Sequence, residues 1–138
     1  MNKLKWGNEY SIGIREIDDQ HREFITIINK LIWAEDNHYP IELGARFIHE
    51  LVKYAEFHFV CEENMMYLHA YEGLPAQVAE HGKLIRIMQM KYNEFRAGAS
   101  SYESVCKFAF MWLISHTTEE DKRFGEFFLK NVGNAGKG

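Results

Sequence analysis

The sequence has few of the residues that interrupt helices or build disulfide frameworks. Only two prolines occur in 138 residues, which favours long helices with few breaks. The two cysteines, Cys61 and Cys106, form no Cys-x-x-Cys motif. A disulfide framework is therefore not indicated, and we expect both cysteines to be buried free thiols.

Signals for membranes, secretion and nucleic acid are also lacking. No uninterrupted apolar run reaches transmembrane length and no signal peptide is recognisable, so we expect a cytoplasmic domain without a membrane partner. The net charge is -4 and no cluster of basic residues occurs, which gives no electrostatic case for binding nucleic acid.

What is present indicates one helical domain. The length and the hydrophobic content of 46% suffice for a single buried core. Apolar residues recur at helical spacing in segments of about 17–36, 41–70 and 74–95 and again after the loop 97–100. Ser100 and Glu103 match a capping box for the fourth helix. Long helices with short links predict an all-α, antiparallel up-down-up-down four-helix bundle.

The two ends of the chain differ from this pattern. Residues 1–16 contain several aromatic side chains, among them Trp6 and Tyr10, but no helical period. We expect them to form an irregular N-terminal arm that packs across the bundle. The helical domain spans residues 1–132, and the glycine-rich residues 133–138 are expected to form a flexible tail.

Polar side chains of metal-binding type lie on the apolar stripes of all four helices. His58 and Glu62 are four residues apart and therefore share one helix face. A carboxylate on an apolar face costs free energy unless it is paired or bound to metal. Each residue alone has a simpler reading, as a satisfied core histidine or, for Asp121, a solvated surface acid. The complete set is His21, His58, Glu62, Gln77, His81, His116 and Asp121.

The fourth helix carries an irregularity at this point. His116 and Asp121 are five residues apart, and five residues of ideal helix rotate by roughly 500°, or about 140° from the starting direction. For both side chains to reach one site the turn must widen. The spacing therefore predicts a π-bulge between His116 and Asp121.

Imidazoles and carboxylates without thiolates suit iron, manganese or zinc and argue against copper(I) or an iron–sulfur cluster. Six such ligands, leaving the amide of Gln77 aside, are more than one tetrahedral zinc needs. Two carboxylates can bridge two cations and offset part of their repulsion. The ligand set therefore predicts a binuclear centre.

The motifs also resemble those of bacterial hemerythrins. The resemblance rests on Ile17-Asp18-Asp19-Gln20-His21, on residues 58–65 (His-Phe-Val-Cys-Glu-Glu-Asn-Met), on the pair 77 and 81, and on the pair 116 and 121. It implies two iron ions (Fe2+/Fe3+) with an oxo or hydroxo bridge, and dioxygen and small anions such as azide as ligands. The implied protein ligands are His21 and His58 on one iron, His81 and His116 on the other, and Glu62 and Asp121 as bridges.

At position 77 the chain departs from the family. The resemblance implies a third histidine on the second iron, but Gln77 stands there. Gln77 can offer a carbonyl oxygen, which is a weaker neutral donor, or it can hydrogen-bond a water that completes the coordination. We further expect Trp112 and Leu113, one turn before His116, to wall the oxygen pocket.

The leading functional hypothesis is a non-haem diiron protein that binds dioxygen as carrier, store or sensor. One alternative is an oxygen- or redox-sensing domain of a larger signalling protein, with an output domain as partner. A diiron oxidase or peroxidase is a further alternative, and an enzyme is the less favoured reading. Carboxylate-rich diiron enzymes carry Glu-x-x-His pairs on two helices, and this arrangement is absent here.

Overall fold

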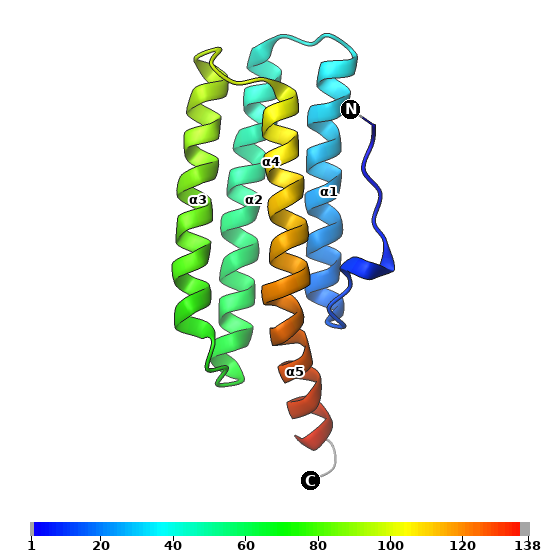
Figure 1. The fold of residues 1–138 in the computed structure, drawn as a ribbon, viewed down its shortest axis with the longest axis vertical. Helices are drawn as coiled ribbons and strands as arrows, with labels where there is room; N and C mark the ends of the chain where they lie inside the picture. The colour runs from blue at the N-terminus through cyan, green and yellow to red at the C-terminus, as the bar shows by residue number, and fades with distance from the viewer. Residues whose placement is uncertain (1, 136–138) are drawn as a thin grey trace.

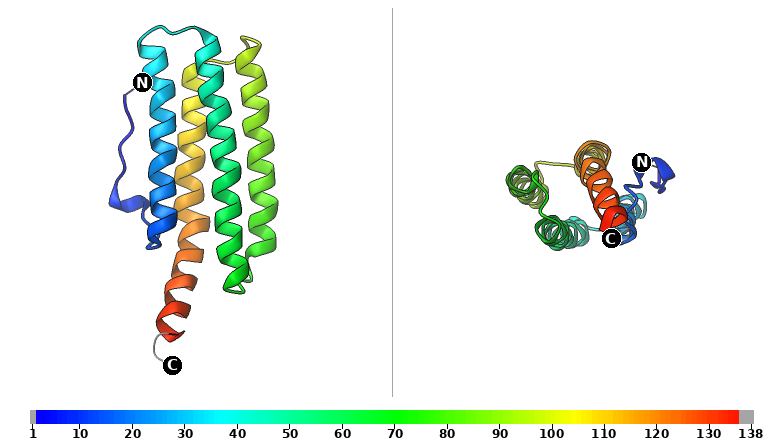
Figure 2. Two further views of the ribbon diagram at one scale, coloured as in Figure 1. Left: turned by 180° about the vertical axis from the view of Figure 1, so that it is seen from behind. Right: turned by 90° about the horizontal axis from the view of Figure 1, so that it is seen from below.

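The fold is an all-α bundle of four antiparallel helices (Figures 1 and 2). The computed structural model describes residues 2–135, except for the side chains of residues 117, 118 and 132–135. The bundle helices are α1 (Arg15–Asp36), α2 (Ile41–Leu68), α3 (Leu74–Arg96) and α4 (Tyr102–Ser115). They follow one another up and down, as the periodicity predicted. No helix among these residues has the length and apolarity needed to cross a membrane.

The chain continues beyond α4 without a turn. The π-helix η2 (His116–Asp121) joins α4 to α5 (Lys122–Ala135), which projects below the bundle (Figure 1). The widened turn expected between His116 and Asp121 is therefore confirmed. α5 extends into the residues expected to form a flexible tail, and residues 136–138 lie outside the part of the chain that is described.

The start of α4 corrects one expectation. Ser101, not Ser100, caps the helix, and its side chain accepts a hydrogen bond of 3.1 Å from the backbone N–H of Ser104. Glu103 then stands one position too early for a reciprocal capping box. It pairs instead with Lys107, with Oε1 2.9 Å from Nζ.

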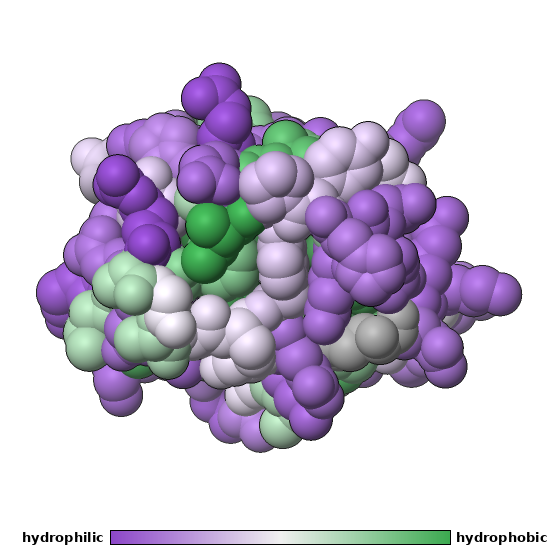
Figure 3. Space-filling view, turned by 90° about the horizontal axis from the view of Figure 1, so that it is seen from above, coloured by the Kyte–Doolittle hydropathy of each residue, from purple (hydrophilic) through white to green (hydrophobic). Residues whose placement is uncertain are grey.

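The core consists of two apolar clusters with a polar layer between them. The larger cluster fills the upper and middle bundle and includes Phe24, Leu51 and Phe95. The smaller one lies near the lower end of the bundle, and its fully buried members include Ile17 and Phe124. The upper end, seen from above in Figure 3, shows mostly hydrophilic surface around a small hydrophobic area.

The N-terminal arm runs along α1 and closes the lower cluster. Near its start, the backbone of Leu4 exchanges two hydrogen bonds with the Asn29 side chain, at 2.8 and 2.9 Å. Near its end, the buried Asp18 carboxylate accepts hydrogen bonds from the Ser11 hydroxyl (2.6 Å) and the Ile12 N–H (2.9 Å). The expected irregular arm is present, with one short 3-10 turn, η1 (Asn8–Tyr10).

A glycine in α5 permits this closure. A Cβ atom added to Gly125 would stand 2.3 Å from the carbonyl oxygen of Ile12. Any larger residue would therefore push the arm away from α5. Because Ile12 and Ile14 belong to the lower apolar cluster, this close approach helps to cover the polar layer from below.

Candidate metal centre

The polar layer contains all seven residues that the sequence singled out for metal binding. They come from α1, from neighbouring turns of α2 and of α3, and from the two ends of η2. Each is at most 3% exposed, although charged and polar side chains are seldom buried so completely. These residues are His21, His58, Glu62, Gln77, His81, His116 and Asp121.

The π-helix sets the direction of two of these side chains. The Nε2 atom of His116 and the Oδ1 atom of Asp121 lie 2.9 Å apart, although an ideal helix would point the two residues in divergent directions. The widened turn thus brings both ends of η2 to one point. A structural role of this kind fits the tendency of π-bulges to occur at functional sites.

A first group of ligand-type atoms joins three helical segments. It comprises His21, His58, Glu62 and Asp121, and one ligand atom from each lies within 4.8 Å of the others. His21 Nε2 is 2.9 Å from Asp121 Oδ2, and His58 Nε2 is 2.7 Å from Glu62 Oε1. All four side chains are fully buried, so the group can hold a cation out of contact with solvent.

A second group shares a carboxylate with the first. It comprises Glu62, His81 and His116. Glu62 Oε1 lies 3.3 Å from His116 Nε2 and 3.9 Å from His81 Nε2. Asp121 adds a second link, because Oδ2 faces His21 of the first group and Oδ1 faces His116 of the second. Two carboxylates therefore stand between two sets of imidazoles.

Two further side chains orient the histidines from behind. His58 Nδ1 donates a hydrogen bond of 2.6 Å to the amide oxygen Oε1 of Gln20, and His81 Nδ1 lies 2.7 Å from Glu63 Oε2. Both contacts leave Nε2 free to face the centre, which is the usual arrangement for ligating histidines. Sequence reasoning missed both partners. The available signal was adjacency, because Gln20 precedes His21 and Glu63 follows Glu62.

The electrostatics of the layer favour bound cations. Burial raises the pKa of Glu62, but the neighbouring His58 and His116 lower it more, so the pKa lies well below its ordinary value. Burial lowers the pKa of His116, but Asp121 and Glu62 raise it well above its ordinary value. The two buried carboxylates therefore favour positive charge beside them, which metal cations supply when they bind.

The orientation of the polar atoms tests whether these residues fit a metal. Several buried nitrogen and oxygen atoms of the layer lie close to one another without making hydrogen bonds, although buried polar groups are normally hydrogen-bonded. They include Nε2 of His21, His58 and His81, both oxygens of Asp121 and Oε2 of Glu62. A bound cation requires lone pairs that point toward one place and are not used in hydrogen bonds. These residues provide that arrangement and therefore fit two metal ions.

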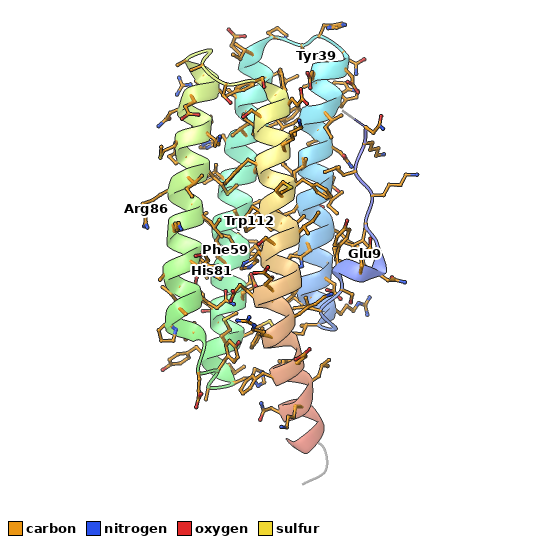
Figure 4. All side chains as sticks on the ribbon, viewed as in Figure 1. Glu9, Tyr39, Phe59, His81, Arg86 and Trp112 are labelled. Carbon is orange, nitrogen blue, oxygen red and sulfur yellow. The ribbon has the colours of Figure 1, made fainter. Side chains whose placement is uncertain are left out.

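Aromatic rings cover the upper side of the polar layer. Phe59 stacks on His81 with ring centroids 4.0 Å apart, and Trp112 stacks on His116 at 5.4 Å (Figure 4). Phe24 meets both Trp112, at 5.3 Å, and His58, at 5.1 Å, edge to face. The layer is therefore separated from the upper bundle by apolar rings that leave little room for water.

The remaining candidates occupy different surroundings. Leu113 is buried in the large apolar cluster. His69 meets the ring of Phe128, His49 meets Tyr92, and His38 is exposed in the α1–α2 turn. None of these histidines belongs to either ligand group among the described residues. Cys61 and Cys106 are free, as expected, and Cys61 is only partly buried.

Comparison with known proteins identifies the family of this centre. The family model of the hemerythrin HHE cation-binding domain matches residues 12–128, which include all seven candidate ligand residues of the polar layer. The chain belongs to the hemerythrin family. Hemerythrins bind dioxygen at a pair of iron ions, and the two groups of buried histidines and carboxylates can hold such a pair.

Relatives and solved structures agree with this assignment. The hemerythrin domain is 30% identical to the bacteriohemerythrin of Methylococcus capsulatus, with 91% of this chain and 96% of that protein aligned. It is 28% identical to the bacteriohemerythrin of Clostridium acetobutylicum, over 86% and 96% of the two chains. The crystal structure of wild-type hemerythrin superposes with a TM-score of 0.79 at 26% identity, over 89% of this chain and 95% of that one.

Proposed function

We propose that this hemerythrin carries or stores dioxygen at two irons whose ligands come from the two buried groups. His21 and His58 bind one iron, and His81 and His116 bind the other. Glu62 and Asp121 bridge the pair. The observation that supports this assignment is the sharing of both carboxylates: each lies within 3.3 Å of histidine nitrogens from both groups.

The surroundings of the centre support reversible binding of a small neutral molecule. Iron, when bound, supplies the electrons for binding dioxygen. The protein supplies a buried site in which His58 and His116 are flanked by apolar rings, among them Phe24 and Trp112. Exclusion of water slows loss of the activated oxygen species to side reactions. We propose that dioxygen binds at an open coordination position of the iron held by His21 and His58, and that azide and similar small anions compete for this position.

A second candidate function is oxygen sensing. It is favoured by the position of η2, because His116 and Asp121 form the joint between the bundle helix α4 and the projecting α5 (Figure 1). A change at the metal pair would alter the direction or the stability of α5. Amide hydrogen exchange in α5 distinguishes the two functions, since a sensor requires a difference between the deoxygenated and oxygenated protein and a carrier does not.

The proposed function is tested by loading the protein with ferrous iron without oxygen. We expect two irons per chain by elemental analysis and a visible absorption band that appears with oxygen and disappears when oxygen is removed. Chelation should then abolish the band. A protein that retains one tightly bound zinc and shows no oxygen-dependent absorption would contradict the proposal.

A further inference from the structure

We infer that the half of the centre held by His81 and His116 has its own exchangeable coordination position, and that Gln77 binds the occupant of this position. The occupant is water, hydroxide or a small monovalent anion. The inference rests on the proposed function, because it requires a metal ion in both groups. It adds a second ligand position to the one at which oxygen is proposed to bind.

The location of Gln77 follows from helix geometry. Gln77 precedes His81 by four residues on α3, so the two side chains share one face of the helix and lie one turn apart. That face is buried, since Gln77 is 3% exposed and His81 is 2% exposed. The next residue, Val78, is 46% exposed, so the buried face is sharply defined at this level.

The side-chain amide of Gln77 lacks the hydrogen bonds that its burial demands. Neither Oε1 nor Nε2 has a partner among the described residues. Direct coordination of a metal through Oε1 would satisfy one atom and leave the two N–H groups of Nε2 unpaired. A small ligand on the metal does better, because its lone pair accepts a hydrogen bond from Nε2 and a coordinated water also donates one to Oε1.

Counting donors leads to the same position. The first group offers two imidazoles, His21 and His58, together with the shared carboxylates. In the proposed function, this half has one position open to dioxygen. With glutamine at position 77, the second half also offers two imidazoles and Glu62, and Asp121 reaches it through the 2.9 Å contact between Oδ1 and His116 Nε2. Two histidines and a carboxylate leave iron with positions open to outside ligands. Equal donor sets therefore predict an open position in both halves.

Replacement of Gln77 by histidine provides the decisive variant. Gln77→His supplies the missing imidazole and should close the second position. Gln77→Ala removes the hydrogen bonds but leaves the position open. Gln89→His is the matched control, because Gln89 is exposed on the same helix. Far-UV circular dichroism and iron analysis establish that each variant is folded and loaded.

Azide titration of the oxidised, iron-loaded proteins gives the readout. We expect two azide ions per iron pair in the wild type and in Gln89→His, but one in Gln77→His. In Gln77→Ala the weaker of the two azide affinities should fall by about tenfold, the typical loss for one hydrogen bond to a charged group. The Mössbauer spectrum of the wild type should change on adding the second azide at the second iron only.

The outcomes separate this inference from the proposed function. One azide per iron pair in both the wild type and Gln77→His, with two irons in each, would overturn the inference and leave the diiron assignment intact. Fewer than two irons in every variant, Gln77→His included, would overturn the diiron assignment and the inference with it.

Discussion

The two halves of the centre share their carboxylates and carry equal numbers of histidines, but they differ in the groups behind those histidines. In the first half, the neutral amide of Gln20 accepts the hydrogen bond from His58. In the second half, the carboxylate of Glu63 stands behind His81. An anionic acceptor makes the imidazole a stronger donor to metal than a neutral one does. The half that lacks a third imidazole thus has the more strongly donating histidine.

If the second half binds iron as proposed, the acceptor behind His81 offsets part of the donation that a third imidazole would have supplied. Glu63 is partly exposed, with 27% of its side-chain surface accessible, so it can keep its charge at little cost. The Gln20 side chain faces the buried His58 instead, where a third carboxylate would add to the negative charge of Glu62 and Asp121. The charged acceptor, Glu63, thus stands where solvent reaches it, and the neutral acceptor, Gln20, stands where the surroundings are buried.

Removal of a carboxylate shared by both halves should weaken metal binding in both halves. It should therefore have the largest effect on iron content. Glu62 lies 2.7 Å from His58 and 3.3 Å from His116, so under the proposed assignment Glu62→Ala takes a ligand from both metals. We expect iron content to fall to less than half of the wild-type value. Breaking a buried charge cluster of this kind costs about 3–5 kcal/mol. Elemental analysis after anaerobic loading measures the loss.

The control for this variant must lie outside the centre. Glu63 is unsuitable, because its contact with His81 makes it part of the support of the second half. Glu80→Ala removes an exposed carboxylate from α3. Equal iron content in the Glu62 and Glu80 variants would show that Glu62 is not a bridge.

Substitution of Gln20 and Glu63, the hydrogen-bond acceptors behind His58 and His81, should have a smaller effect on iron binding. It should affect one half of the centre at a time. Loss of such a partner typically reduces metal affinity by 10- to 100-fold. Glu63→Gln should therefore speed release of the second iron to a chelator by about tenfold and leave the first unchanged. Gln20→Glu should slow release of the first iron only. Release rates that do not change in either variant would mean that the acceptors only fill space.

The features that could be predicted from the sequence are those encoded within one helix. Periodicity placed His58 and Glu62 on one face, and the spacing between His116 and Asp121 required the π-helix that the structure contains. A histidine or carboxylate on the apolar face of a helix stands out in the sequence, because burying such a group costs free energy unless it has a partner. Each helix could therefore be assigned its inward polar residues without knowledge of its neighbours.

The features that were missed depend on how helices meet. Gln20 on α1 reaches His58 on α2, and Glu63 on α2 reaches His81 on α3. Such contacts depend on the height at which two helices pack, which periodicity within either helix does not determine. The cap of α4 was misplaced for a different reason. Ser100 and Ser101 are chemically equivalent caps, and only the position of the loop decides between them.

Substitution of Trp112, whose ring lies above the centre, should have the smallest effect, and only on the lifetime of the oxygenated form. Trp112 stacks on His116 in the second half and meets Phe24, which in turn meets His58 in the first half. Trp112→Phe keeps an apolar ring but leaves a small gap between the two halves, through which water can approach. We expect the oxygenated form to decay roughly three- to tenfold faster, a difference below about 1.4 kcal/mol. Iron content should stay at the wild-type value, because Trp112 provides no ligand.

Trp33→Phe is the matched control for this last variant. Trp33 is 48% exposed at the far end of α1, where it stacks on Tyr39, so the same change of side chain there opens no path to the metals. Decay of the oxygenated form, followed by its visible absorption, should be unchanged in this control. Equal lifetimes in both variants, with full iron in each, would show that Trp112 does not wall the oxygen pocket. The apolar barrier would then have to be formed by Phe24 and Phe59, the other rings that meet the ligating histidines.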